Sequence, residues 1–200
     1  MSTGRIVLAL SGASGAPYAR AALGALVAAG RRVLLIASPV ARQVWQEELD
    51  ENFTAWLDSL PPEKRALIEV QNHQDVGAGC ASGSFRHDGM LVIPCSAKTL
   101  AGIAHGYASN LTERAADVCL KERRKLVLVF RETPISLIHI ENMRAVTLAG
   151  GIVLPASPGF YHGDSSYQGL VDFVAGKALD LFEVPHDLFR RWKEPRCDGK

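Results

Sequence analysis

Short apolar runs recur along the chain, and longer segments with helix-like spacing lie between them. The runs are rich in branched residues, which is typical of strands buried on both faces of a parallel sheet. The predicted strands cover residues 6–10, 33–37, 66–70, 90–93, 126–130 and 152–154. The predicted helices cover residues 16–29, 40–48, 98–105, 111–123, 134–149 and 167–182. This alternation predicts an α/β fold with a parallel sheet.

The length and composition fit one ordinary domain. The chain has 200 residues, 48% of them hydrophobic, so it can bury a sizeable core. We expect a single domain, with a core over about 5–183 and a tail over 184–200, and a polar loop over 60–65. Lys and Arg number 22 against 21 acidic residues, so no global field favours a nucleic-acid or membrane partner.

The cysteines and the apolar stretches bear on location and metal binding. Cys80, Cys95, Cys119 and Cys197 are scattered and form no spacing expected of a zinc site, so we expect reduced thiols and no metal. The first apolar run is too short for a signal peptide, and no stretch approaches membrane-spanning length. A cytoplasmic protein is expected.

The strand over 126–130 ends abruptly at Arg131-Glu132-Thr133-Pro134. Ligands of open α/β sheets gather beyond the carboxyl ends of the strands, which favours a pocket beneath Arg131 and Glu132. An exposed strand exit is the alternative. Pro134 suits the first turn of the following helix, where its missing N–H is harmless.

Three other strand ends lead into helix starts rich in hydroxyl groups or small residues. Residues 11–17 are a small-residue turn whose free N–H groups would suit a phosphate, although it lacks the G-x-G-x-x-G spacing. Ser14 there could cap the helix or act on a substrate. Ser38 is explained by capping alone, whereas residues 94–99 offer two hydroxyls and an ammonium.

Several polar residues have two interpretations. Arg114 and Lys121 share one helix face with Asp117, which is either a solvated, salt-bridged face or an anion site. Glu48 sits in an acidic cluster that is usually a solvated surface. The Ser-Gly-Ser turn over 82–84 is ordinary turn chemistry or a loop against a flat ligand.

Taken together, these motifs resemble those of the UbiX family of flavin prenyltransferases. The resemblance runs from about Ile6 to about Phe182. The matching blocks, in order, are Gly12-Ala13-Ser14-Gly15-Ala16, Ser82-Gly83-Ser84-Phe85, the block Pro94 to Ile103, Arg114-Ala115-Ala116-Asp117-Val118, Leu120 to Arg124, and Arg131-Glu132-Thr133-Pro134.

The resemblance implies a fold, a reaction and partners. The fold would be a Rossmann-like (flavodoxin-like) three-layer sandwich. The enzyme would transfer the dimethylallyl group of dimethylallyl phosphate to N5 and C6 of reduced FMN without a metal. The product, prenylated FMN, would serve a UbiD-type decarboxylase, and the protein would form a homo-dodecamer with sites between subunits.

The resemblance also implies site residues. The FMN contacts would be Gly12, Ala13, Ser14, Ser38, Ser96, Ala97, Lys98, Thr99 and Arg131. The catalytic residues would be Ser14, Glu48 and Glu132. The prenyl phosphate would be held by Arg114, Lys121, Tyr161 and Lys177.

Two departures from the family pattern keep alternatives open. Lys177 stands where the family commonly has arginine, which keeps the charge but loses the bidentate fork. Gly163-Asp164 stands where the family usually has Arg-Pro. An FMN-binding carrier, or a flavin-dependent decarboxylase without prenyl transfer, is therefore the alternative function.

Overall fold

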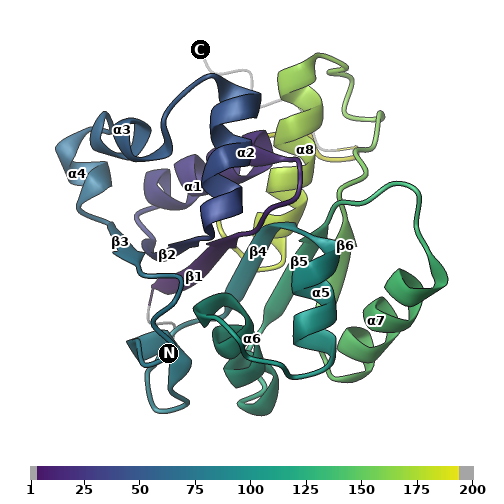
Figure 1. Cartoon of the computed structure of the whole chain (residues 1–200). Coiled ribbons are helices and arrows are strands. Elements are labelled where there is room, and N and C mark those ends of the chain that lie inside the picture. Colours follow the sequence, from purple (N-terminus) through teal and green to yellow (C-terminus); the bar gives the residue numbers. More distant parts are fainter. Residues whose placement is uncertain (1–3, 194–200) are drawn as a thin grey trace.

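The computed structural model describes residues 4–193 and contains one six-stranded parallel sheet (Figure 1). The strands are β1 (Arg5–Leu10), β2 (Arg32–Ala37), β3 (Ile68–Gln71), β4 (Met90–Cys95), β5 (Leu126–Phe130) and β6 (Ile152–Pro155). Their order is β3-β2-β1-β4-β5-β6, so the winding reverses between β1 and β4. This is the doubly wound order of Rossmann-like sheets, and the reversal is where such sheets bind ligands.

Helices cover both faces of the sheet. The first layer holds α1 (Ala16–Ala28), α2 (Pro39–Leu49), α3 (Phe53–Asp58) and α8 (Tyr167–Asp180). The second layer holds α5 (Ala97–Ala104), α6 (Leu111–Lys121), α7 (Leu137–Leu148) and a short 3-10 helix, η1 (Gly79–Ala81). Alternate residues of β1 face the two layers: Ile6 and Leu8 pack toward α1, Val7 and Ala9 toward α6. The predicted three-layer α/β sandwich is confirmed.

Most predicted elements match, and the differences have local causes. α3 was not predicted, and α4 (Pro62–Arg65) lies inside the predicted polar loop. The helix predicted from Pro134 begins at Leu137 instead. Ser136 and His139 form a capping box, in which each side chain accepts the other residue's N–H, and this box sets the start of α7.

No helix within residues 4–193 is long and apolar enough to cross a membrane. One helix nevertheless shows an exposed apolar face: α7 and the residue pair before it leave large aliphatic side chains at the surface. These are Ile135, Leu137, Ile138, Ile140 and Leu148. Several large apolar side chains exposed along one helix typically mark an interface with another protein.

Candidate active site

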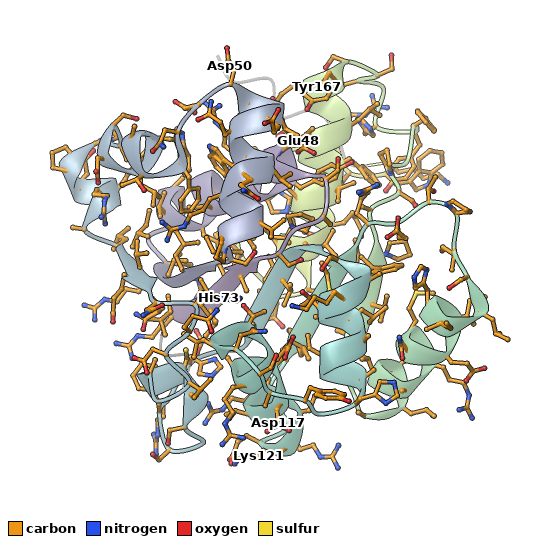
Figure 2. The ribbon with its side chains drawn as sticks, in the orientation of Figure 1. Glu48, Asp50, His73, Asp117, Lys121 and Tyr167 are labelled. Carbon is orange, nitrogen blue, oxygen red and sulfur yellow. The ribbon has the colours of Figure 1, made fainter. Side chains whose placement is uncertain are left out.

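A cavity of about 320 Å³ opens where β1 and β5 end. Its walls come from segments far apart in the chain. The lining residues are Ser14, Gly15, Pro17, Tyr18, Glu48, Arg131, Tyr167 and Val171. Figure 2 shows Glu48 and Tyr167 at the same end of the molecule. The cavity therefore lies at the carboxyl edge of the sheet, beside the strand where the winding reverses.

Glu48 lies in the last turn of α2 and anchors the start of α1. The N–H of Gly15 donates to both carboxylate oxygens, at 3.1 and 2.9 Å, and the N–H of Ala16 donates at 2.8 Å. Gly15 has φ +127°, and a Cβ there would lie 2.7 Å from Cδ2 of Tyr18, so only glycine fits. The interpretation of Glu48 as a solvated surface residue is wrong. The expectation that these N–H groups are open to a phosphate is wrong too, because the carboxylate occupies them.

Replacing Glu48 with alanine is expected to destabilise the fold by about 1–2 kcal/mol, because two N–H groups at a helix start lose their acceptor. Unfolding of the native assembly by heat or denaturant measures the difference. Glu47→Ala, at the exposed neighbouring position, is the matched control and should change stability by less than about 0.5 kcal/mol. Equal stability of the two variants would contradict the anchoring role.

Ser11 ties the ends of β1 and β4 together across the switch point. Its buried hydroxyl donates to the carbonyl of Pro94 at 2.8 Å and accepts from the N–H of Ser96 at 2.8 Å. Ser96 in turn caps α5 by accepting the N–H of Thr99 at 3.3 Å. Ser11 was within a predicted turn but was not predicted as a site residue, since its contact with β4 spans 83 positions.

The other predicted FMN contacts lie in the loop after β1 and at the starts of α2 and α5, and none of them lines this cavity. Gly12 packs against the start of α2, where a Cβ would lie 2.6 Å from Cγ1 of Val40. Ser38 caps α2 as predicted, accepting the N–H of Ala41 at 3.0 Å. The remaining predicted contacts are Ala13 in the β1–α1 loop and Ala97 and Lys98 in the first turn of α5, where Lys98 lines a separate pocket. Ser14 is exposed and makes no capping bond, so of its two interpretations the cap is excluded.

Arg131 links the end of β5 to the loop after β1. Its Nε donates to the carbonyl of Ser14 at 3.2 Å, which places the guanidinium in the wall of the cavity. Glu132 follows it, partly buried, and one of its oxygens accepts the N–H of Thr133 at 3.0 Å. The prediction of a position over a pocket is confirmed for Arg131, but Glu132 is not among the residues that line the cavity.

Two tyrosines of the cavity were missed by sequence reasoning. Tyr18 lies in the first turn of α1, and Tyr167 begins α8. Burial is the main cause that raises the pKa of Tyr18, and Tyr167 and Glu48 raise it further, whereas Arg131 opposes them. The phenol is thus kept protonated in the cavity. The small-residue turn just before Tyr18 was the sequence signal that could have pointed to this tyrosine.

Arg114 and Lys121 lie far from this cavity in the same chain. Figure 2 shows Lys121 and Asp117 at the end of the molecule opposite Glu48. Arg114 pairs with Asp117 at 2.7 Å, and Lys121 pairs with Glu122. The interpretation as a solvated, salt-bridged face therefore describes α6 in the isolated chain. The 82–84 turn lies against the same end of α6, since a Cβ on its central glycine would lie 2.7 Å from Nζ of Lys121.

Tyr161 and Lys177 occupy a third place, along α8. The ring of Tyr161 packs edge-on against Phe173, with centroids 5.6 Å apart. Lys177 follows Phe173 by one helical turn, and its ammonium lies 3.7 Å from a carboxylate oxygen of Asp180. Neither residue lines the cavity beside Glu48. The structure thus brings together Ser14, Glu48 and Arg131 but leaves the predicted phosphate-binding residues on other surfaces.

Comparison with known proteins shows the family to which this chain belongs. Residues 1–179 match the family model described as Flavoprotein. "Flavin prenyltransferase UbiX" of Methanothermobacter thermautotrophicus is 47% identical, with 94% of each chain covered.

Two solved structures are also similar. One is AnUbiX (PadA1) in complex with FMN and dimethylallyl pyrophosphate, with TM-score 0.86 and 44% identity over 96% of this chain and 98% of that one. The other is a dodecameric FMN-dependent UbiX-like decarboxylase from Escherichia coli O157:H7, with TM-score 0.86 and 41% identity over 95% of this chain and 100% of that one. The protein therefore belongs to the flavoprotein family and, within it, to the UbiX flavin prenyltransferases.

Proposed function

We propose that this protein transfers the dimethylallyl group of dimethylallyl phosphate to N5 and C6 of reduced FMN, without a metal, and that prenylated FMN then serves a UbiD-type decarboxylase. The observation that carries the proposal is the cavity at the switch point, where Ser14, Glu48 and Arg131 meet. A close relative named as a flavin prenyltransferase and a similar structure holding FMN and an allylic donor support it.

The residues around the crevice fit FMN. The start of α1 is closed by Glu48, so the flavin phosphate is assigned to the starts of α2 and α5, capped by Ser38 and Ser96. The first N–H groups of a helix have no acceptor inside the helix and attract a phosphate. Arg131 is then placed beside the ring system.

The chain's own groups supply charge and proton handling. Reduced FMN, when bound, supplies the nucleophilic N5 and C6 atoms. Breaking the allylic C–O bond leaves its electron pair on the phosphate, and a proton from the Glu132 carboxyl neutralises part of that charge. Arg114, Lys121, Tyr161 and Lys177 donate to the phosphate oxygens. Glu48, held by two main-chain N–H groups, is the carboxylate placed to accept a proton near Ser14.

A second copy of the chain completes the site in this proposal. Lys121 lies at the opposite end of the subunit from Glu48, as does Asp117, with which Arg114 pairs, so both cations can reach a cavity only in a neighbouring copy. The exposed aliphatic face of α7 offers the apolar surface that assembly needs. We therefore propose a homo-dodecamer, the state named for the similar Escherichia coli protein.

The proposal also includes one domain in the cytoplasm. Both hydrophobic layers pack on one sheet, which supports a single flavoprotein domain with its core over about 5–183. Cys80, Cys95 and Cys119 are buried free thiols, which fits a reducing compartment. Burial raises the pKa of Cys80 to about 11 and that of Cys119 to about 12, so neither is a nucleophile at neutral pH.

Anaerobic incubation with reduced FMN and dimethylallyl phosphate, followed by mass spectrometry of the extracted flavin, tests the function. The expected result is a flavin heavier by one C5H8 unit. The diphosphate donor is tested in parallel. Unmodified FMN recovered from protein that binds it tightly, with either donor, would overturn the proposal and favour the carrier.

A further inference from the structure

After α8 ends, residues 184–193 run back along the helix, and the carboxylate of Asp180 holds this segment in place. Asp180 accepts hydrogen bonds from Nη2 and Nη1 of Arg191, at 2.6 and 3.0 Å, and pairs with Nε2 of His186 at 3.1 Å. The Asp180 side chain is 20% exposed. Burial raises its pKa, but Arg191 and His186 outweigh burial and leave the pKa below its usual range. Asp180 is therefore ionised and held at both oxygens.

The returning segment sits against the residues assigned to the allylic phosphate. The ring of Phe189 packs directly on Gly176, where a Cβ would lie 2.6 Å from that ring. The next contact places Trp192 edge-on to Tyr161, with ring centroids 5.4 Å apart. Residues 184–193, predicted as part of a tail, thus pack on α8 and on the loop that carries Tyr161; residues 194–200 lie outside the described part of the chain.

Whether the ammonium of Lys177 is available to a ligand depends on which groups bind the carboxylate of Asp180. Its ammonium lies 3.7 Å from Oδ2, beyond hydrogen-bond distance, and its side chain is 46% exposed. The same oxygen is already bound by Nη1 of Arg191 at 3.0 Å. An ammonium is a point charge that one carboxylate can hold. Arg191 therefore occupies the oxygen that lies nearest to Lys177, and without Arg191 that oxygen would be left to the ammonium.

We propose that Arg191 is a positioning residue for the allylic phosphate: by occupying Asp180, it keeps the ammonium of Lys177 available to the donor. This inference rests on the proposed function, in which Lys177 binds the donor phosphate.

The test measures donor binding and turnover separately, on the FMN-loaded assembly. Calorimetry with dimethylallyl phosphate should show a Kd about 10-fold higher for Arg191→Gln, while FMN affinity and kcat at saturating donor stay unchanged. Arg190→Gln, at the adjacent exposed arginine, is the matched control and should bind the donor like the unchanged protein. A melting curve checks that each variant is folded.

A second substitution distinguishes the proposed competition for Lys177 from a merely structural role of Arg191. Adding Asp180→Asn to Arg191→Gln removes the carboxylate that would capture Lys177, so donor affinity should return to nearly the original value. A double variant as weak as the single one, or an unchanged Kd in Arg191→Gln, would overturn the inference. If the unchanged protein binds the donor but does not prenylate FMN, only the proposed function is overturned, because the Kd values of the variants can still be compared. No donor binding at all would overturn both.

Discussion

Glu132→Gln is expected to slow prenyl transfer by about 10²- to 10⁴-fold, the usual contribution of a positioned acid. Glu132 follows β5 at the carboxyl edge of the sheet, directly after Arg131, whose side chain lies in the cavity wall. Glutamine keeps the size and the oxygen that accepts the N–H of Thr133 at 3.0 Å, so the local structure should survive. It has no proton of suitable acidity to give to the departing phosphate. The loss should therefore fall on the chemical step.

The measurement is the rate of prenylated flavin formation at saturating donor, with FMN affinity determined separately. FMN affinity should change by less than about twofold, because the loss lies in proton transfer. Glu141→Gln, at an exposed position on α7, provides the control for removing one negative charge nearby in sequence. If Glu132→Gln turns over as fast as the control, Glu132 has no part in the mechanism.

The fold could be predicted from the sequence because its signal is local. Each buried strand is a run of branched apolar residues such as 126–130, and each is followed by a segment long enough for a right-handed crossover. The start of α7 was misplaced because two local signals compete there. Pro134 favours an early start, but the capping box of Ser136 and His139 satisfies more backbone groups and wins.

The contacts that build the cavity were beyond prediction from the sequence pattern. Glu48 meets the start of α1 across 33 positions, and Ser11 meets Pro94 across 83. Periodicity shows which face of a helix is polar but does not show what that face meets. For this reason the pattern alone favoured a solvated Glu48, and only the family resemblance pointed to a functional one.

The structure of a single subunit does not explain a role for Lys121, because this residue lies far from the cavity of its own chain. Within one subunit its ammonium pairs with Glu122 at the end of the molecule remote from the cavity. Lys121→Ala is expected to lower prenyl transfer by about 10²- to 10³-fold, as for loss of one group that stabilises developing charge. Arg123→Ala removes a nearby exposed cation and should have little effect. Rates are measured on assemblies of unchanged mass.

Mixed assemblies of two inactive variants decide whether Lys121 acts across subunits. Lys121→Ala subunits keep Glu132, and Glu132→Gln subunits keep Lys121. If each site takes these residues from two different copies, random co-assembly in equal amounts restores both to about a quarter of the sites. Co-expression with two affinity tags and tandem purification yields such assemblies, and about a quarter of the original activity is expected. If both residues acted within one chain, no site would be complete and activity would stay at the level of the separate variants.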